Sequence, residues 1–229
     1  MPHSTSPFPW LVHLLTSSGA LLGFFTLLAL EERNFHFAAL LSLGALSVDS
    51  LDGTAARWVD IRKRLPDFNG RRLDDIVDYL NYAIVPAYFM LAAESLAHPA
   101  WACLPILSSA FGFCHLEAKT RDDFFRGFPS YWNILAIYLW WYEVEPWLST
   151  LIVVTLSVSV FCPLKFIYPS KLKRLRKTTC ILGAFWVISV VGAILSTDVR
   201  LASNLMILSL AYPLYYFSLS VWLGGWFRK

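Results

Sequence analysis

Four aspartates stand at the ends of two neighbouring apolar stretches, and their spacing is the clearest sign of chemistry in the sequence. Asp49 and Asp52 close the first stretch, and Asp74 and Asp78 open the second. Side chains three or four residues apart lie on one face of a helix, so each pair would point the same way. In two antiparallel helices Asp49 and Asp78 would lie deepest and at similar depth. All four carboxylates could then face a common centre.

Carboxylates gathered in a medium of low dielectric constant cannot all stay ionised unless cations neutralise them. Hard oxygen ligands suit Mg²⁺ or Mn²⁺, so the pattern predicts one or two divalent ions. Gly53 and Ala56 share the face of Asp49 and would let a ligand approach the backbone, while the planar guanidinium of Arg57 suits phosphate. The alternative is an interfacial network in which the acids pair with Arg57, Arg62, Arg71 and Arg72. Four acids in register with two small residues favour the cation site.

The elements that must hold these residues are membrane helices. Hydrophobic residues make up 57% of the chain and charged residues only 15%, whereas a soluble domain carries about 25% charged residues. A helix needs about 20 largely apolar residues to cross the bilayer core. Eight stretches meet or approach this length: 8–30, 36–56, 74–94, 99–117, 130–143, 147–164, 178–196 and 202–226. We therefore predict an all-α polytopic membrane protein with about eight transmembrane helices.

The lysines and arginines test this topology independently. If the N-terminus is cytoplasmic, alternate loops place 17 of the 19 basic residues in the cytoplasm and leave only Arg33 and Arg200 outside. Cationic loops stay on the cytoplasmic side during insertion, so we expect both termini in the cytoplasm and the four aspartates near the cytoplasmic boundary. The alternative, a soluble domain of buried helices, has no reason to segregate charge in alternate loops.

Other features of the chain point away from further chemistry. The basic cluster from Lys171 to Lys177 has no interleaved aromatic residues, so we interpret it as a topology signal beside anionic headgroups and expect no nucleic-acid partner. The four cysteines show no CxxC spacing and the five histidines no paired-ligand pattern, so we interpret both as packing or interfacial residues. No linker or repeat interrupts the sequence, which predicts a single membrane domain, 1–229.

The aspartates belong to a longer pattern that resembles a known signature. The string Asp49-x2-Asp52-Gly53-x2-Ala56-Arg57-x12-Gly70-x3-Asp74-x3-Asp78 is similar to the signature of the CDP-alcohol phosphotransferases. Its interval of twelve residues between Arg57 and Gly70 is about one helical turn longer than in most of that family. This interval, the chain length, the eight-span layout and the segment 125–133 (FRGFPSYWN) resemble the bacterial phosphatidylcholine synthase branch.

That resemblance implies a reaction and a role for each residue of the signature. An alcohol oxygen would attack the β-phosphorus of CDP-diacylglycerol, and CMP would leave. Two ions, Mn²⁺ or Mg²⁺, would clamp the diphosphate and be held by Asp49, Asp52, Asp74 and Asp78. Asp78 would also be the base that takes the hydroxyl proton. The CDP moiety would be bound by Asp52, Gly53, Ala56, Arg57, Gly70 and Asp74.

The branch implies choline as the acceptor alcohol. A quaternary ammonium is best held by aromatic faces together with a carboxylate. Residues at the cytoplasmic level that could form such a cage are Asn81, Tyr82, Glu117, Tyr131 and Trp132. The alternative for the aromatic members is an interfacial membrane belt. Candidates for binding lipid phosphate, with plain topology charges as the alternative, are Lys119, Arg121 and Arg126.

Three other functions remain to be distinguished. The nearest is phosphatidylserine synthase or another CDP-diacylglycerol-dependent phosphatidyltransferase. The phosphatidylserine synthase branch has a similar Gly-Leu-Pro-Ser-Pro run where this chain has GFPSY at 127–131. The long interval and the pair Tyr131 and Trp132 favour choline. A cation transporter would spread its acids through the membrane depth, and a non-catalytic scaffold would not need four of them. The resemblance implies a bacterial inner membrane, an active site that faces the cytoplasm, surrounding membrane lipid and a homodimer as the oligomer to test.

Overall fold

The computed structural model describes residues 8–59, 61–120, 122–172 and 175–226. This part of the chain is mostly helical and divides into two compact units. The first unit comprises Met1–Ile106 and Trp132–Ser149, and the second comprises Leu107–Tyr131 and Thr150–Lys229. Two helices begin in the first unit and end in the second: α6 (Cys103–Cys114) and α8 (Pro146–Ser159).

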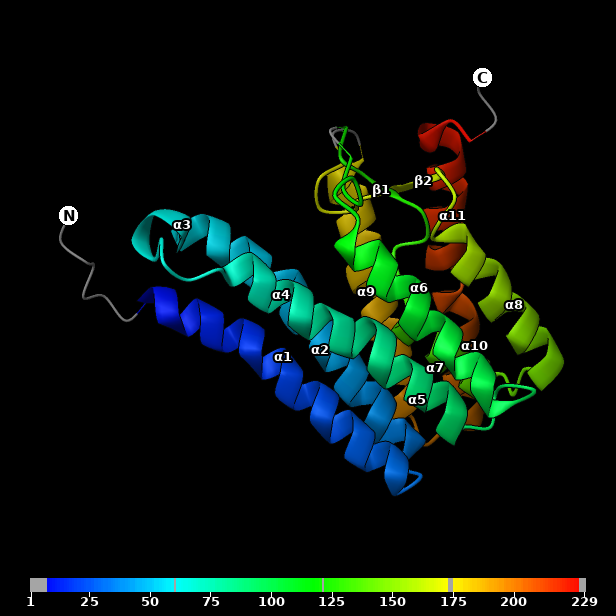
Figure 1. Cartoon of the computed structure of the whole chain (residues 1–229). Coiled ribbons are helices and arrows are strands. Elements are labelled where there is room, and N and C mark those ends of the chain that lie inside the picture. The colour runs from blue at the N-terminus through cyan, green and yellow to red at the C-terminus, as the bar shows by residue number, and fades with distance from the viewer. Residues whose placement is uncertain (1–7, 60, 121, 173–174, 227–229) are drawn as a thin grey trace. The chain divides into compact units, whose positions relative to one another are not determined.

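The first unit is built around two long helices, α1 (Phe8–Glu31) and α2 (Phe35–Val59), which form a tight antiparallel pair (Figure 1). A continuous helical segment packs against α1 and consists of α4 (Gly70–Tyr79), the π-helical turn η1 (Leu80–Ile84) and α5 (Val85–Ala92). This segment corresponds to the predicted span 74–94. The unit is completed by α3 (Ile61–Arg64), the 3₁₀ turn η2 (Pro99–Ala102) and α7 (Trp132–Trp141).

Small residues let α1 approach this helical segment closely. A Cβ atom built on Gly19 would lie 2.9 Å from Cγ1 of Val77, and one on Gly23 would lie 2.6 Å from Oδ1 of Asn81. Glycines spaced by four residues are the usual means by which membrane helices bring their backbones together. The start of α4 is fixed by Asn69, whose side chain accepts a hydrogen bond from the backbone N–H of Arg72.

The second unit combines helices with a short β-ladder. Strands β1 (Phe124–Arg126) and β2 (Lys165–Ile167) pair antiparallel, with Phe125 opposite Phe166. The helices that lie wholly in this unit are α9 (Arg176–Leu195), α10 (Val199–Ser209) and α11 (Ala211–Gly224). Both strands lie in segments that we expected to be loops. The sequence did not indicate them, because a run of three residues is too short to show the alternating pattern of a strand.

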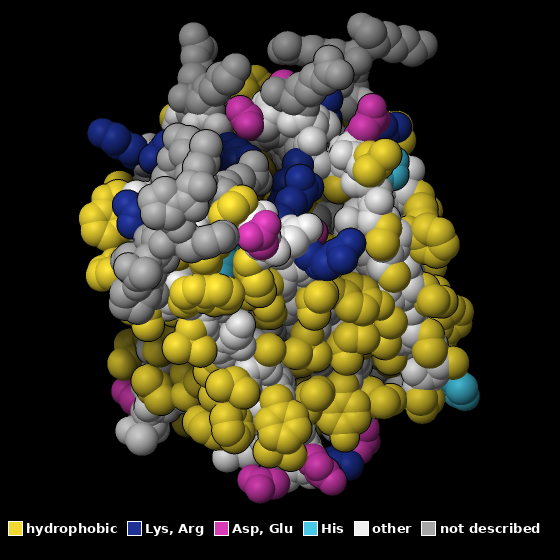
Figure 2. Space-filling view, turned by 60° about the vertical axis from the view of Figure 1, so that its left-hand side comes forward, with side chains coloured by type: hydrophobic (Ala, Val, Ile, Leu, Met, Phe, Trp, Pro, Cys, Tyr) yellow, Lys and Arg dark blue, Asp and Glu magenta, His cyan; other side chains and the backbone are white. Residues whose placement is uncertain are grey.

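The helices have the composition of membrane segments. Among the described residues, three helical segments are long and apolar enough to cross a bilayer: Phe8–Glu31, Arg176–Leu195 and Val199–Gly224. Two shorter apolar helices are Pro99–Cys114 and Pro146–Ser159. On the face in Figure 2, hydrophobic side chains form a broad band with charged side chains at its ends. Bands of exposed apolar side chains mark a lipid-facing surface, so the chain is an integral membrane protein.

Candidate functional site

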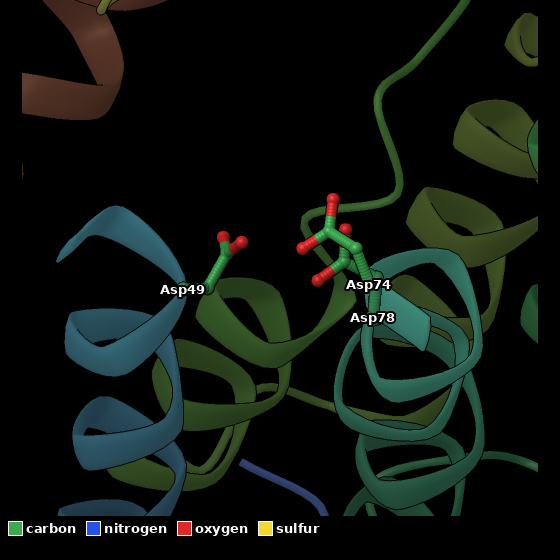
Figure 3. A group of neighbouring side chains, drawn as sticks. All are labelled: Asp49, Asp74 and Asp78. Carbon is green, nitrogen blue, oxygen red and sulfur yellow. The ribbon is translucent and has the colours of Figure 1, made fainter. Parts of the chain in front are cut away.

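Three of the four aspartates converge in the first unit. Asp49 from α2 and Asp74 and Asp78 from α4 can each offer a carboxylate oxygen, and these oxygens lie within 4.8 Å of one another. Figure 3 shows Asp49 reaching from its helix towards the other two, which leave the same face of α4. A hard divalent cation lies about 2.0–2.6 Å from each oxygen ligand, so oxygens this far apart can share one ion. The residues present therefore fit the metal that the resemblance implies.

The fourth aspartate, Asp52, stands outside this group but lines the same cavity. All four aspartates face a small space of about 10 Å³ together with residues of α1 and η1. Asp52 is buried, with 4% of its surface exposed, and its polar neighbours include the side chains of Thr16 and Arg57. A space of this size holds about one water-sized species.

The π-helical turn supplies two further residues to this cavity, Asn81 and Tyr82. The Tyr82 hydroxyl donates a hydrogen bond to Oδ2 of Asp49 at 2.7 Å. Nδ2 of Asn81 donates to the carbonyl oxygens of Gly19 and Val77, both at 3.0 Å. Both residues were predicted for choline binding from their place after Asp78. In the structure both residues lie beside the carboxylates. The hydrogen bond from Nδ2 of Asn81 to the Gly19 carbonyl joins η1 to α1.

The remaining residues of the signature lie around the C-terminal end of α2 and the N-terminal end of α4. Arg57 is exposed and donates to the Thr54 hydroxyl at 3.0 Å, and a Cβ built on Gly53 would meet only Nη1 of Arg57, at 3.5 Å. The backbone at Gly53 is therefore open to close approach. Gly70 is different, because a Cβ there would collide with Cε1 of His13 and lie 3.2 Å from its Nδ1. Because glycine has no side chain, position 70 leaves room for the His13 ring.

The other residues predicted for choline or lipid phosphate belong to both units. Trp132 is fully buried at the start of α7, in the first unit. In the second unit the ring of Tyr131 packs edge-on against Tyr216, with centroids 5.7 Å apart. Glu117 and Arg126, which we predicted for two different ligands, form an ion pair of 2.5 Å with each other. The Lys119 ammonium lies 5.9 Å from the centroid of the Tyr168 ring. Arg121 lies outside the described residues.

A second ion pair lies beside the β-ladder of the second unit. Nζ of Lys165 donates to Oδ2 of Asp122 at 2.6 Å, and both side chains are partly exposed. This hydrogen bond, with the charge of the lysine, lowers the pKa of the Asp122 carboxyl. Arg126 in β1 and Lys165 in β2 therefore have acidic partners within the unit, which the sequence pattern did not indicate.

Three buried polar groups gave no signal in the sequence. Within the described part of the chain, Nε2 of His13, Oδ1 of Asn133 and Oγ of Ser157 are buried without a hydrogen-bond partner. A buried polar atom left in this way suggests a missing ligand or water. Asn133 ends the segment 125–133, but its side chain gave no signal of its own. His13 lies three residues before Thr16 on α1, and a lone histidine in an apolar helix is not distinguishable from a packing residue by sequence.

The comparisons with known proteins agree on one family. The model of the CDP-alcohol phosphatidyltransferase family matches residues 10–164, which include all four aspartates. The chain is 35% identical over 210 residues to the phosphatidylcholine synthase of Borreliella burgdorferi, covering 89% of this chain and 90% of that protein. It is 36% identical over 210 residues to the phosphatidylcholine synthase of Legionella bozemanae, covering 88% and 97%. The chain therefore belongs to the CDP-alcohol phosphatidyltransferase family.

Proposed function

We propose that this protein is a phosphatidylcholine synthase, which transfers the phosphatidyl group of CDP-diacylglycerol to choline and releases CMP. The observation that carries the proposal is the convergence of Asp49, Asp74 and Asp78, with Asp52 in the same cavity. It is supported by the likeness to relatives named phosphatidylcholine synthase over most of the chain.

The reaction would be an in-line displacement at the β-phosphorus. Asp78 would take the proton of the choline hydroxyl, whose oxygen forms the new bond to phosphorus while the bond to CMP breaks. The metal ligands would be Asp49, Asp52, Asp74 and Asp78, and two bound Mn²⁺ or Mg²⁺ ions would neutralise charge on the entering and leaving oxygens. The CDP moiety would lie against Asp52, Gly53, Ala56, Arg57, Gly70 and Asp74. The exposed guanidinium of Arg57 and the open space beside Gly53 support this placement.

Choline would be recognised as a cation by aromatic faces. Of the residues that we assign to it, Tyr82 and Asn81 line the carboxylate cavity, which supports their place near the reacting oxygen. The sequence assigns Tyr131, Trp132 and Glu117 to choline as well. Lys119, Arg121 and Arg126 would hold lipid phosphate. Aromatic faces recognise a quaternary ammonium without hydrogen bonds to its methyl groups.

The chain would work as a single domain of eight membrane spans with both termini in the cytoplasm. The segregation of 17 of the 19 basic residues into alternate loops supports this topology. This topology would put the carboxylates near the cytoplasmic surface of a bacterial inner membrane, where CDP-diacylglycerol can present its nucleotide to the cytoplasm and keep its acyl chains in lipid. Whether two copies assemble would be read from the mass of the detergent-solubilised protein.

Release of CMP from CDP-diacylglycerol and choline tests the carboxylate site. We expect release to require Mn²⁺ or Mg²⁺, to stop in excess EDTA and to return when the metal is restored. When the concentration of Mn²⁺ or Mg²⁺ is limiting, Asp49→Asn should slow the release of CMP, because it removes one anionic ligand from the site. Full activity in excess EDTA would overturn the proposed metal site.

A further inference from the structure

The helix that carries Asp74 and Asp78 changes its hydrogen bonding directly after them. Residues Leu80–Ile84 form a π-helical turn, in which the backbone N–H of Val85 donates to the carbonyl of Leu80, five residues back. Pro86 follows at once, and a proline has no N–H to donate and crowds the preceding turn. Single π turns within α-helices occur frequently at functional sites, because the wider turn gives side chains directions that an α-helix cannot.

The wider turn directs Tyr82 across to α2. The Tyr82 side chain is buried, with 6% of its surface exposed, and its hydroxyl meets Oδ2 of Asp49 at 2.7 Å. This distance is typical of a good O–H···O bond, and a bond to an ionised acceptor is about twice as strong as a neutral one. The hydrogen bond therefore fixes the direction of one particular carboxylate.

Of the three converging carboxylates, Asp49 is the one whose position is least fixed by its own helix. Asp74 and Asp78 share one helix, so their relative position follows from the helix itself. Asp49 comes from α2, which packs mainly along α1 and reaches the α4–η1–α5 segment through η1. A side chain from η1 that holds Asp49 therefore determines whether the third carboxylate faces the other two.

We propose that Tyr82 is a positioning residue for the metal site, whose hydroxyl holds Asp49 in place so that its carboxylate completes the group with Asp74 and Asp78. The proposal rests on the proposed function only in taking these carboxylates as the site of a divalent cation. Groups that hydrogen-bond to metal ligands typically change metal affinity or activity by about 10–100-fold when removed. The role belongs to the hydroxyl, so it is separable from any contact that the ring makes with choline.

Direct measurement of Mn²⁺ binding tests this role without activity. Full-length protein would be purified in detergent, stripped with EDTA, freed of the chelator and titrated with Mn²⁺, with unbound Mn²⁺ followed by electron paramagnetic resonance. Tyr82→Phe removes one oxygen and should raise the Mn²⁺ Kd by about 10-fold or more. Tyr79→Phe is the matched control, because that tyrosine is in the adjoining turn and its hydroxyl donates to the backbone carbonyl of Ile106 at 3.1 Å. Its Mn²⁺ Kd should equal that of the wild type.

A second measurement separates positioning from loss of structure. With EDTA present, Tyr82→Phe and Tyr79→Phe should unfold at similar temperatures. An unchanged Mn²⁺ Kd in Tyr82→Phe, or an equal loss in Tyr79→Phe, would overturn the proposal. Failure of the wild type itself to bind Mn²⁺ would instead refute the metal site in the proposed function.

Discussion

Replacing Gly23 by alanine tests the packing that holds η1 beside the carboxylates. The new Cβ would lie 2.6 Å from Oδ1 of Asn81 and 3.3 Å from Cδ2 of Leu80. Carbon–oxygen contacts usually begin at about 3.3 Å, so Asn81 would have to move by roughly 0.7 Å. That movement would strain the two hydrogen bonds from its Nδ2 to the carbonyl oxygens of Gly19 and Val77.

Three effects set the change in the free energy of unfolding: two destabilise the protein and one stabilises it. Overfilling a packed interface costs about 1–3 kcal/mol. Loss of one hydrogen bond costs about 1 kcal/mol, or about 0.6 kcal/mol between membrane helices. Alanine in place of glycine within a helix returns about 1 kcal/mol. We expect Gly23→Ala to lower the free energy of unfolding by about 1–3 kcal/mol, measured by circular dichroism during denaturation in mixed detergent micelles.

Gly44→Ala provides the matched control in α2. A Cβ at Gly44 would lie 3.7 Å from Cδ1 of Leu22, an ordinary contact, so this variant should be as stable as the wild type or up to about 1 kcal/mol more stable. If Gly23→Ala proves as stable as Gly44→Ala, Asn81 does not lock α1 to η1 in the way the structure indicates.

Three other substitutions address the proposed roles. Asp78→Asn should reduce turnover by about 10²–10⁴-fold with little change in the KM for CDP-diacylglycerol, and wild-type turnover would exclude Asp78 as the base. Gly70→Ala should destabilise the protein in the wild type but much less in a His13→Ala background, whereas an equal loss in both backgrounds would mean that the glycine serves something other than the His13 ring. Tyr131→Leu should raise the choline KM by roughly 5–30-fold, the equivalent of a cation–π contact of about 1–2 kcal/mol, and an unchanged KM would remove Tyr131 from the choline pocket.

Local spacing was sufficient to predict where long helices lie and which carboxylates share a face of one helix. Asp74 and Asp78 are four residues apart on one helix, so their common face follows from helix geometry alone. The predicted span 8–30 agrees with α1, Phe8–Glu31, because a long apolar run has one favourable environment. The family signature then connected two separate helices, which spacing within either helix could not do.

Contacts between distant segments were beyond the reach of the sequence. The hydrogen bond from Tyr82 to Asp49 depends on a π turn that no periodicity indicates, since the residues involved also fit an α-helix. The ion pair of Glu117 with Arg126 joins residues nine positions apart in the chain, and charge alone suggested two separate ligands. Asp52 shares the face of Asp49 by spacing, yet it is more deeply buried and stands outside the group of three.

The most direct test is the choice of acceptor by the purified protein. CDP-diacylglycerol would be supplied with labelled choline, serine, glycerol or inositol in the presence of Mn²⁺, and labelled lipid and CMP would be measured together. We expect phosphatidylcholine and CMP in equal amounts from choline, little product from the other three alcohols and none in excess EDTA. Labelled lipid from serine, glycerol or inositol without any from choline would contradict it.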